Sequence, residues 1–395
     1  MNSTVASLDL DPYSPEWLRD PYPFHELLRE AGPVVRLAKY GVWALARYEH
    51  VRSTLNRWEV FCSSAGVGLA NFNREPPWRT PSLLLETDPP VHTRYRDVIT
   101  RVLSRQSLKS LRPQFEAEAD TLIDQLISRG TFDAVRDLAQ VFPLKVFPDA
   151  VGVDDNAREH LLLYGDMAFN AFGPRNALFE EAMKKVEPVG AYVAARCQRE
   201  ALQQQRFGHQ LFQEVDSGKV SEADASLLVR SLLTAGVDTT VSALSSAILL
   251  LAQNPDQWHL LRDDPTLARS AFEEAVRCES PVQTFFRTTT EDVVVDGVAI
   301  PAGEKVLMFL GAANRDPRRW ADPDRFDIRR NTTGHVGFGG GIHGCVGQLI
   351  ARLEGETILS KLARRVRSIE LTGEPAVQLN NTLRGWSTIP VRIAP

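Results

Sequence analysis

The residues with the clearest chemical potential lie near the C-terminal end, where a single cysteine is set among glycines. The stretch from Phe338 to Ala351 places Cys345 in a glycine-rich loop, directly before an apolar run with the pattern of a helix. Glycine allows a sharp turn without a Cβ clash, and the N–H groups that begin a helix stabilise an anionic sulfur. A thiolate held in this way is a good axial ligand for haem iron. The alternative is that Cys345 is a small buried apolar residue in a turn.

A second group of reactive side chains interrupts a long apolar segment, which is predicted to be one helix over residues 224–254. Gly236, Asp238, Thr239 and Thr240 lie near its middle, and all have mediocre helix propensity. Threonine hydroxyls there can bond the carbonyl oxygen four residues back, which predicts a distorted helix. An acid beside a hydroxyl can relay protons. The alternative is a threonine-rich kink with a solvent-facing aspartate.

The glycine loop carries the whole string Phe-Gly-x-Gly-x-His-x-Cys-x-Gly, with Phe338, His343, Cys345 and Gly347 in register. This string is the haem-ligand signature of the cytochrome P-450 family, which the chain resembles. The resemblance implies a mainly α fold with small β-sheets, in which haem b lies between a long distal helix and the helix after the cysteine loop. It further implies that Cys345 is the metal ligand, and that Asp238 and Thr239 supply protons for oxygen activation.

The same resemblance implies roles for charged residues around the haem. Those that would bind its propionate groups are His92, Arg96, Arg287 and His343. Glu274 and Arg277, spaced by three on one predicted helix, would form a buried triad with Arg325. This triad would support the cysteine loop, so its role would be structural.

The stretches 79–90, 169–174 and 280–290 resemble those of a narrower bacterial group, the O-demethylases of para-methoxybenzoate and related para-substituted benzoates. The resemblance implies that the substrate carboxylate is bound by Arg79, Ser82 and Ser231. The side chains expected to enclose the ring and its para group are Phe169, Phe172, Phe285, Thr234 and Ala235. Thr234 replaces the serine expected in that group, and its extra methyl group leaves the preferred para substituent open.

The elements that must position these groups are predicted to be mostly helical. Apolar periodicity predicts helices over 115–127, 189–205 and 224–254. Strands and turns are expected at 34–46, 284–312 and 369–393, and residues 63–82 predict a long functional loop. The chain has 395 residues, of which 43% are hydrophobic and 24% charged, as in ordinary globular proteins. Since no linker or repeat divides it, one domain over residues 1–395 is expected.

Composition and charge restrict the partners. The net charge of −5 favours neither nucleic acid nor an anionic membrane. The N-terminus lacks the pattern of a signal peptide, and no run predicts a membrane span, so a cytoplasmic location is expected. Basic groups over 94–112 and 364–367 predict docking of an acidic electron donor. The family resemblance implies a 2Fe-2S ferredoxin, which receives electrons from NAD(P)H through a ferredoxin reductase.

The sequence therefore predicts a haem-dependent monooxygenase that demethylates or hydroxylates a para-substituted aromatic acid such as 4-methoxybenzoate. One alternative is a haem-thiolate enzyme that uses peroxide or isomerises its substrate. The pair Asp238 and Thr239 argues against it, because direct use of peroxide can dispense with a proton relay. Another alternative is a haem-binding protein without catalytic activity.

Overall fold

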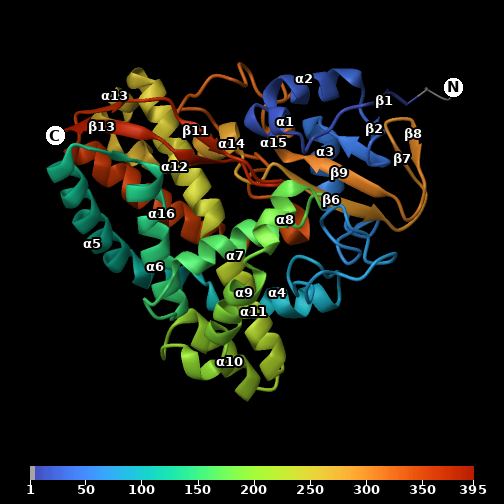
Figure 1. The fold of residues 1–395 in the computed structure, drawn as a ribbon, viewed down its shortest axis with the longest axis horizontal. Helices are drawn as coiled ribbons and strands as arrows, with labels where there is room; N and C mark the ends of the chain where they lie inside the picture. Colours follow the sequence, from blue (N-terminus) through green and yellow to red (C-terminus); the bar gives the residue numbers. More distant parts are fainter. Residues whose placement is uncertain (1–4) are drawn as a thin grey trace.

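The computed structural model describes residues 5–395, with most helices gathered on one side and the main sheet on the other (Figure 1). The sheet and the N-terminal helices lie at the upper right of the view, and the helices from residue 105 to 263 fill the left and lower parts. The prediction of a mainly α fold with small β-sheets is confirmed.

The helices divide into three successive groups. The first group is α1 (Pro15–Arg19), α2 (Tyr22–Ala31), α3 (Tyr48–Asn56), α4 (Val91–Val102), α5 (Arg105–Arg129) and α6 (Val141–Val151). The second group is α7 (Glu159–Asn170), α8 (Ala177–Met183), α9 (Val186–Arg196), α10 (Phe207–Asp216), α11 (Glu222–Ala235) and α12 (Asp238–Gln253). The third group is α13 (Pro255–Asp263), α14 (Ala268–Glu279), α15 (Leu310–Asn314) and α16 (Gln348–Arg365).

The largest sheet has six strands in the order β1-β2-β3-β9-β6-β4. They are β1 (Ser7–Leu8), β2 (Val35–Leu37), β3 (Val42–Leu45), β4 (Phe61–Cys62), β6 (Thr284–Thr289) and β9 (Lys305–Phe309). The hairpin β7 (Val293–Val295) and β8 (Val298–Ile300) turns at Asp296 and Gly297, which both have positive φ, as expected from the Asp-Gly pair. The remaining small sheets are formed by β5 (Thr131–Asp133), β10 (Ser368–Leu371), β11 (Ala376–Gln378), β12 (Gly385–Thr388) and β13 (Pro390–Ala394).

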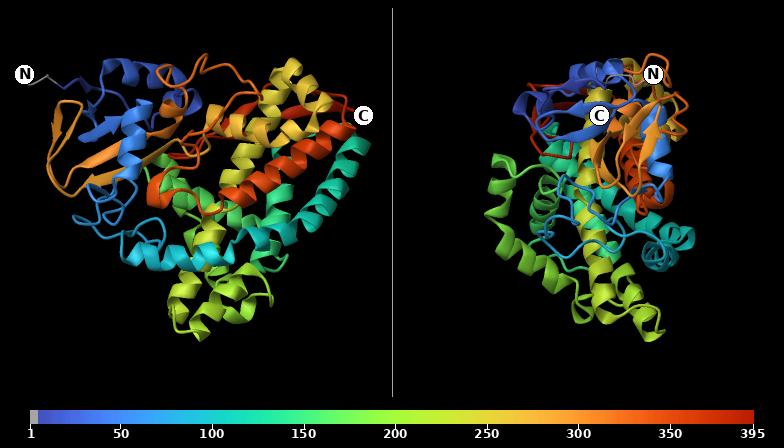
Figure 2. Two further views of the ribbon diagram at one scale, coloured as in Figure 1. Left: turned by 180° about the vertical axis from the view of Figure 1, so that it is seen from behind. Right: turned by 90° about the vertical axis from the view of Figure 1, so that its right-hand side faces the viewer.

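The helical core is built around α12, which contacts α14 and α16, while α16 also packs along α5. Seen from behind, α16 and α5 run side by side at one edge (Figure 2). The segment Glu222–Gln253 has the length and hydropathy of a membrane span, contrary to the sequence expectation, but 67% of its most apolar window is buried in the protein. Its hydrophobicity therefore serves the core.

Two predicted helices differ from those observed. The helix expected over 224–254 is divided into α11 and α12 at Gly236 and Val237. A Cβ at Gly236 would lie 2.2 Å from the Phe147 ring and 2.8 Å from the carbonyl oxygen of Leu232, so this tight passage requires glycine. The predicted distortion is thus confirmed, and it is a complete break.

The helix expected over 189–205 ends earlier, at Arg196 in α9. The chain then forms a short 3-10 turn over Arg199–Ala201. It next approaches α6, where the N–H of Gln203 donates to the carbonyl oxygen of Gly152 at 3.0 Å. Among residues 197–205, only Cys197 and Leu202 are buried, so the apolar spacing that suggested a longer helix rests on these two side chains.

Candidate functional site

One cavity brings together the cysteine loop, the break between α11 and α12, and the loop before α4. Its lining includes Cys345 and the glycines around it, together with Gly236 and Thr239 from the break. The other predicted site residues that line this cavity are Arg79, Ser82, Arg96, Phe169, Phe172, Ser231, Thr234, Ala235, Phe285, Arg287, Phe338, His343 and Gly347. The structure therefore brings most of the predicted site together, from segments more than 200 residues apart.

The cysteine loop is fixed by backbone contacts. The N–H of Cys345 donates to the carbonyl oxygen of Phe338 at 2.8 Å. Gly341 has φ of 61°, and a Cβ there would lie 2.2 Å from the carbonyl oxygen of Leu55, so the loop presses against α3. Burial raises the pKa of Cys345, while the N–H groups of Gly347 and Gln348 oppose this rise. The predicted N–H stabilisation of sulfur is therefore present, but desolvation outweighs it.

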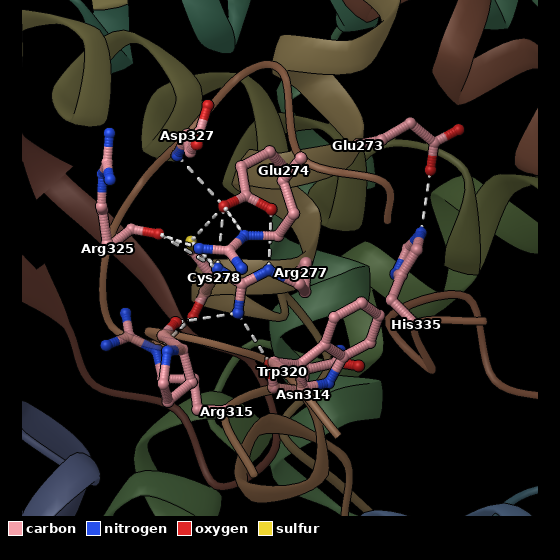
Figure 3. Close-up of polar contacts among 12 residues, drawn as sticks. Glu273, Glu274, Arg277, Cys278, Asn314, Arg315, Trp320, Arg325, Asp327 and His335 are labelled. Carbon is pink, nitrogen blue, oxygen red and sulfur yellow. Dashed lines mark hydrogen bonds and ion pairs between the residues drawn. The ribbon is translucent and has the colours of Figure 1, made fainter. Parts of the chain in front are cut away.

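An ionic network behind the loop was not foreseen from the sequence. Glu273 on α14 accepts a hydrogen bond from His335 at 2.8 Å and forms an ion pair with Arg352 on α16. The guanidinium of Arg352 lies 4.6 Å from the centroid of the Phe338 ring. Figure 3 shows the contact between Glu273 and His335. This network joins α14 and α16 to both flanks of the loop.

The predicted buried triad is present, but with a different third residue. Glu274 and Arg277 are fully buried and form two hydrogen bonds, of 2.7 and 2.8 Å. The second guanidinium on Glu274 belongs to Arg330, at 2.9 Å, and not to Arg325. The guanidinium of Arg325 points away in Figure 3, and only its carbonyl oxygen accepts from Arg277 and Arg330. The sequence prediction of Arg325 is therefore wrong. The turn between residues 325 and 330 brings the side chain of Arg330, and not that of Arg325, against the carboxylate of Glu274.

The four residues predicted to bind propionates lie together as a group of polar side chains that includes two guanidinium cations. The rings of His92 and His343 are 4.4 Å apart between centroids, and Arg96 and Arg287 line the cavity beside them. Within residues 5–395, the Nε2 atoms of both histidines are buried without a hydrogen-bond partner. Burial lowers the pKa of His92 to about 4 and that of Arg287 to about 10, and Asp88, whose Oδ1 lies 3.7 Å from Nε2 of His343, offsets only part of this desolvation. These unused donors beside a cysteine loop fit a haem with two propionate groups.

Asp238 and Thr239 begin α12 at the break. The hydroxyl of Thr239 donates to the carbonyl oxygen of Ala235 at 2.9 Å and lies on the cavity wall. The carboxyl group of Asp238 is turned towards α7, where a Cβ on Gly165 would lie 1.5 Å from its Oδ2. That oxygen is buried without a partner in residues 5–395, and burial together with Asp166 raises the pKa of Asp238 well above its usual value. The alternative of a solvent-facing aspartate is therefore wrong.

The far end of the cavity holds the predicted carboxylate-binding residues. The hydroxyls of Ser82 and Ser231 are 3.2 Å apart, which joins the loop before α4 to α11. Arg79 forms an ion pair of 3.2 Å with Glu86. Arg230, which the sequence prediction omitted, also lines the cavity and donates to the carbonyl oxygen of Thr80 at 2.8 Å. Its position next to Ser231 was the only available signal.

The apolar part of the cavity contains the predicted aromatic cluster. The rings of Phe169 and Phe172 are 5.8 Å apart at 81°, and those of Phe172 and Phe285 are 5.8 Å apart at 67°. Such edge-to-face contacts hold the rings in fixed orientations. Thr234 and Ala235 complete this part of the wall, and the Thr234 hydroxyl donates to the carbonyl oxygen of Arg230 at 2.7 Å.

The comparison with known families decides the identity of this arrangement. The model of the cytochrome P-450 family matches residues 171–264 and 261–389. CYP199A2 of Rhodopseudomonas palustris is 55% identical, over 99% of this chain and 95% of that protein. The chain belongs to the cytochrome P-450 family. It is therefore a haem-dependent monooxygenase.

Two further relatives define the range of this P-450's similarity. The beta-dihydromenaquinone-9 omega-hydroxylase of Mycobacterium tuberculosis is 33% identical, over 98% of this chain and 79% of that protein. The solved structure of the cytochrome P-450 CREJ, in complex with (4-ethylphenyl) dihydrogen phosphate, matches with a TM-score of 0.88 and 25% identity. That match covers 97% of this chain and 99% of CREJ.

The basic groups predicted to dock an electron donor are partly neutralised within the chain. Arg101 pairs with Glu214 at 3.0 Å, and Arg112 pairs with Glu356 at 3.0 Å. Arg365 is bound to Asp124. Within residues 5–395, the basic residues of these groups that form no ion pair are Arg94, Arg96, Arg105, Lys109, Arg364 and Arg367. The charge available to an acidic partner is therefore smaller than the sequence count suggests.

Proposed function

We propose that this P-450 oxidises a small para-substituted aromatic carboxylic acid, such as 4-methoxybenzoate, by O-demethylation or hydroxylation at the para group. The observation that carries the proposal is the polarity of the cavity. Besides the cysteine loop, the cavity is lined by the aromatic cluster of Phe169, Phe172 and Phe285 and by two guanidinium groups and two hydroxyls, those of Arg79, Arg230, Ser82 and Ser231. An aromatic acid matches this combination, because it joins a flat apolar ring to a carboxylate and leaves its para group at the opposite end of the ring.

The residues around the cavity have different roles in the proposed reaction. When bound to Cys345, haem b supplies the activation of dioxygen. The arginines and serines bind the carboxylate, and the phenylalanine cluster orients the ring so that the para substituent faces the metal side. Thr239 places a hydroxyl group at the cavity wall, and burial of the neighbouring Asp238 raises the pKa of its carboxyl group, which favours the form that carries a proton.

Similar proteins support an anionic aromatic ligand. CREJ was solved with an aryl phosphate, which is also a para-substituted benzene ring that carries an anionic group. The 55% identity to CYP199A2 covers the segments that form both ends of the cavity. We further propose that a 2Fe-2S ferredoxin delivers the electrons, from NAD(P)H through a ferredoxin reductase, in the cytoplasm and without a membrane or nucleic-acid partner.

A spin-state titration tests the substrate class. The haem-loaded protein is titrated with 4-methoxybenzoate and, as a neutral control of equal shape, with 4-methoxybenzamide. We expect the acid to bind at least about tenfold more tightly, because a charge-assisted hydrogen bond contributes about 1.5–3 kcal/mol. Equal binding of acid and amide would contradict the carboxylate site. Formaldehyde release with a reconstituted ferredoxin system then distinguishes demethylation from hydroxylation.

A further inference from the structure

The anion-binding end of the cavity contains a carboxylate of its own. Glu86 is only 5% exposed, and one of its oxygens, Oε2, lies 3.2 Å from Nη1 of Arg79. The same oxygen accepts a hydrogen bond from the N–H of Ser82 at 2.8 Å. Glu86 therefore binds to two of the residues that would recognise a substrate carboxylate.

The position of Glu86 is fixed by a short turn. Its own N–H donates to the carbonyl oxygen of Ser82 at 3.0 Å, so residues 82 and 86 are bonded in both directions. The Ser82 hydroxyl accepts from the N–H of Leu85 at 3.2 Å and also contacts Ser231. Because these hydrogen bonds fix the turn and attach it to α11, the Glu86 carboxylate stays beside Arg79.

The charges at this end leave one net positive charge. Arg79 and Arg230 line the cavity as cations, and Glu86 offsets one of them. Lys305, which interacts electrostatically with Glu86, donates its amino N–H groups to the carbonyl oxygens of Ala65 and Gly66, and burial lowers its pKa to about 7, so it is mostly uncharged at pH 8. Arg96 and Arg287, the other cations of the cavity, lie with His343 at the haem end.

A buried carboxylate is a costly way to build an anion site. Desolvation of a carboxylate costs several kcal/mol before any pairing, and a second anion close to it is repelled. If the site were built only for strong attraction of anions, Glu86 would oppose its purpose. The presence of Glu86 is explained if the site must limit the negative charge of the ligand that it binds.

We propose that Glu86 is a specificity residue that restricts the anion site to ligands with a single negative charge. A monoanionic benzoate neutralises the net charge of the site, whereas a dianionic aryl phosphate leaves a surplus negative charge beside Glu86. The proposal rests on the proposed function, because it assumes that Arg79 and Ser82 face the substrate anion. It adds selection between anions, which the arginines and serines do not provide.

The variant Glu86→Gln tests this selection. Glutamine retains an oxygen that can accept from the N–H of Ser82, but it removes the negative charge that pairs with Arg79. The haem-loaded proteins are titrated at pH 8 with 4-ethylbenzoate and with 4-ethylphenyl phosphate, which is a dianion at that pH because its second pKa is about 6. We expect the substitution to shift the ratio of the two dissociation constants at least about tenfold towards the phosphate, because at an effective dielectric constant of about 20 one extra charge within about 12 Å of Glu86 is repelled by at least that much.

The matched control is Glu75→Gln, since Glu75 lies on the same loop but is exposed. It should leave the ratio within about twofold, because exposed charges are screened. A ratio that is unchanged in Glu86→Gln, or equally changed in both variants, would overturn the proposal. A wild-type protein that binds 4-ethylbenzoate no better than 4-ethylbenzamide would instead overturn the proposed function on which it rests.

The wild-type protein provides a second test if Glu86→Gln does not fold. At pH 5.5 most of the aryl phosphate is a monoanion. Its affinity, relative to that of 4-ethylbenzoate at the same pH, should rise about tenfold between pH 8 and pH 5.5. No rise would show that the site does not select by charge.

Discussion

The two ends of the cavity use ionic groups in different ways. Around the cysteine loop, ion pairs join segments that are distant in sequence, as Glu273 of α14 joins Arg352 of α16 and Glu274 of α14 joins Arg330 of a connecting loop. At the anion-binding end, Arg79, Ser82 and Glu86 lie within eight residues of one another and contact each other, and Ser82 bonds to Ser231 of the helix α11. The ion pairs around the cysteine loop fix that loop from several sides. At the anion-binding end the contacts lie within one short turn, so its residues can be substituted with little effect on the core. We infer that the cysteine end is built for stability and haem binding and the other end for specificity.

The largest effect should follow from Cys345→Ser. The variant should lose the red-shifted Soret band of the reduced, carbon monoxide-treated protein and all monooxygenase activity, because no thiolate remains to bind iron. Absorption spectroscopy of the reconstituted protein checks this. A variant that kept the red-shifted band would show that another residue is the ligand.

The buried triad should be the next most sensitive feature. Glu274→Gln leaves Arg277 and Arg330 without a counter-charge in the core, and we expect the free energy of unfolding to fall by about 3–5 kcal/mol. Denaturant unfolding of the haem-free protein measures this loss. Arg325→Ala is the matched control, and it should change stability by less than about 0.5 kcal/mol because its guanidinium lies outside the triad. An equal loss in both variants would contradict the assignment of Arg330.

At the other end, Arg79→Ala should affect binding more than folding. We expect the dissociation constant of 4-methoxybenzoate to rise by about 10–100-fold, since a charge-assisted hydrogen bond is lost and Glu86 is left without its counter-charge. The amide should bind as before. Arg74→Ala, at an exposed arginine of the same loop, should leave both constants unchanged. A similar weakening for acid and amide would show that Arg79 only supports the loop.

The smallest of these effects concerns Asp238. Its pKa is raised in the folded protein, so its contribution to stability is complete below its ordinary value near 3.9 and decreases as the pH rises through the folded value. Asp238→Asn removes this dependence, and we expect it to increase the free energy of unfolding at pH 8 by at least about 1.4 kcal/mol, the equivalent of one pKa unit. The gain should disappear below about pH 4. A gain that does not vary with pH would exclude a titrating carboxyl group at this site.

Much of the site could be predicted from the sequence because its chemistry is encoded in contiguous strings. The loop from Phe338 to Gly347 and the segment from Ala235 to Thr240 each contain reactive groups together with the residues that shape the local backbone. The site residues predicted from these strings, except Asp238, line the same cavity. The helix break at Gly236 could also be anticipated, because glycine, aspartate and threonine weaken a helix wherever they occur.

Predictions failed where a residue's role depends on a distant partner. Arg325 and Arg330 have the same side chain five residues apart, and only the turn between them decides which one reaches Glu274. The burial of the Asp238 carboxylate depends on Gly165 of α7. Because glycine has no side chain, it leaves room for the carboxylate at this position. The basic groups were overestimated because their acidic partners, such as Glu214 and Glu356, come from other helices.

The sequence by itself therefore determined the haem-thiolate chemistry. The cysteine ligand, its glycine loop and the helix after it lie in one short contiguous segment, so their types and spacing can be read directly from the sequence. Only the tertiary structure decided which charges meet, that is, Arg330 at the triad, and Glu86 and Arg230 at the anion site. The physical reason is that electrostatic energy depends on distance and burial. Both quantities are set by packing between segments that lie far apart in the chain.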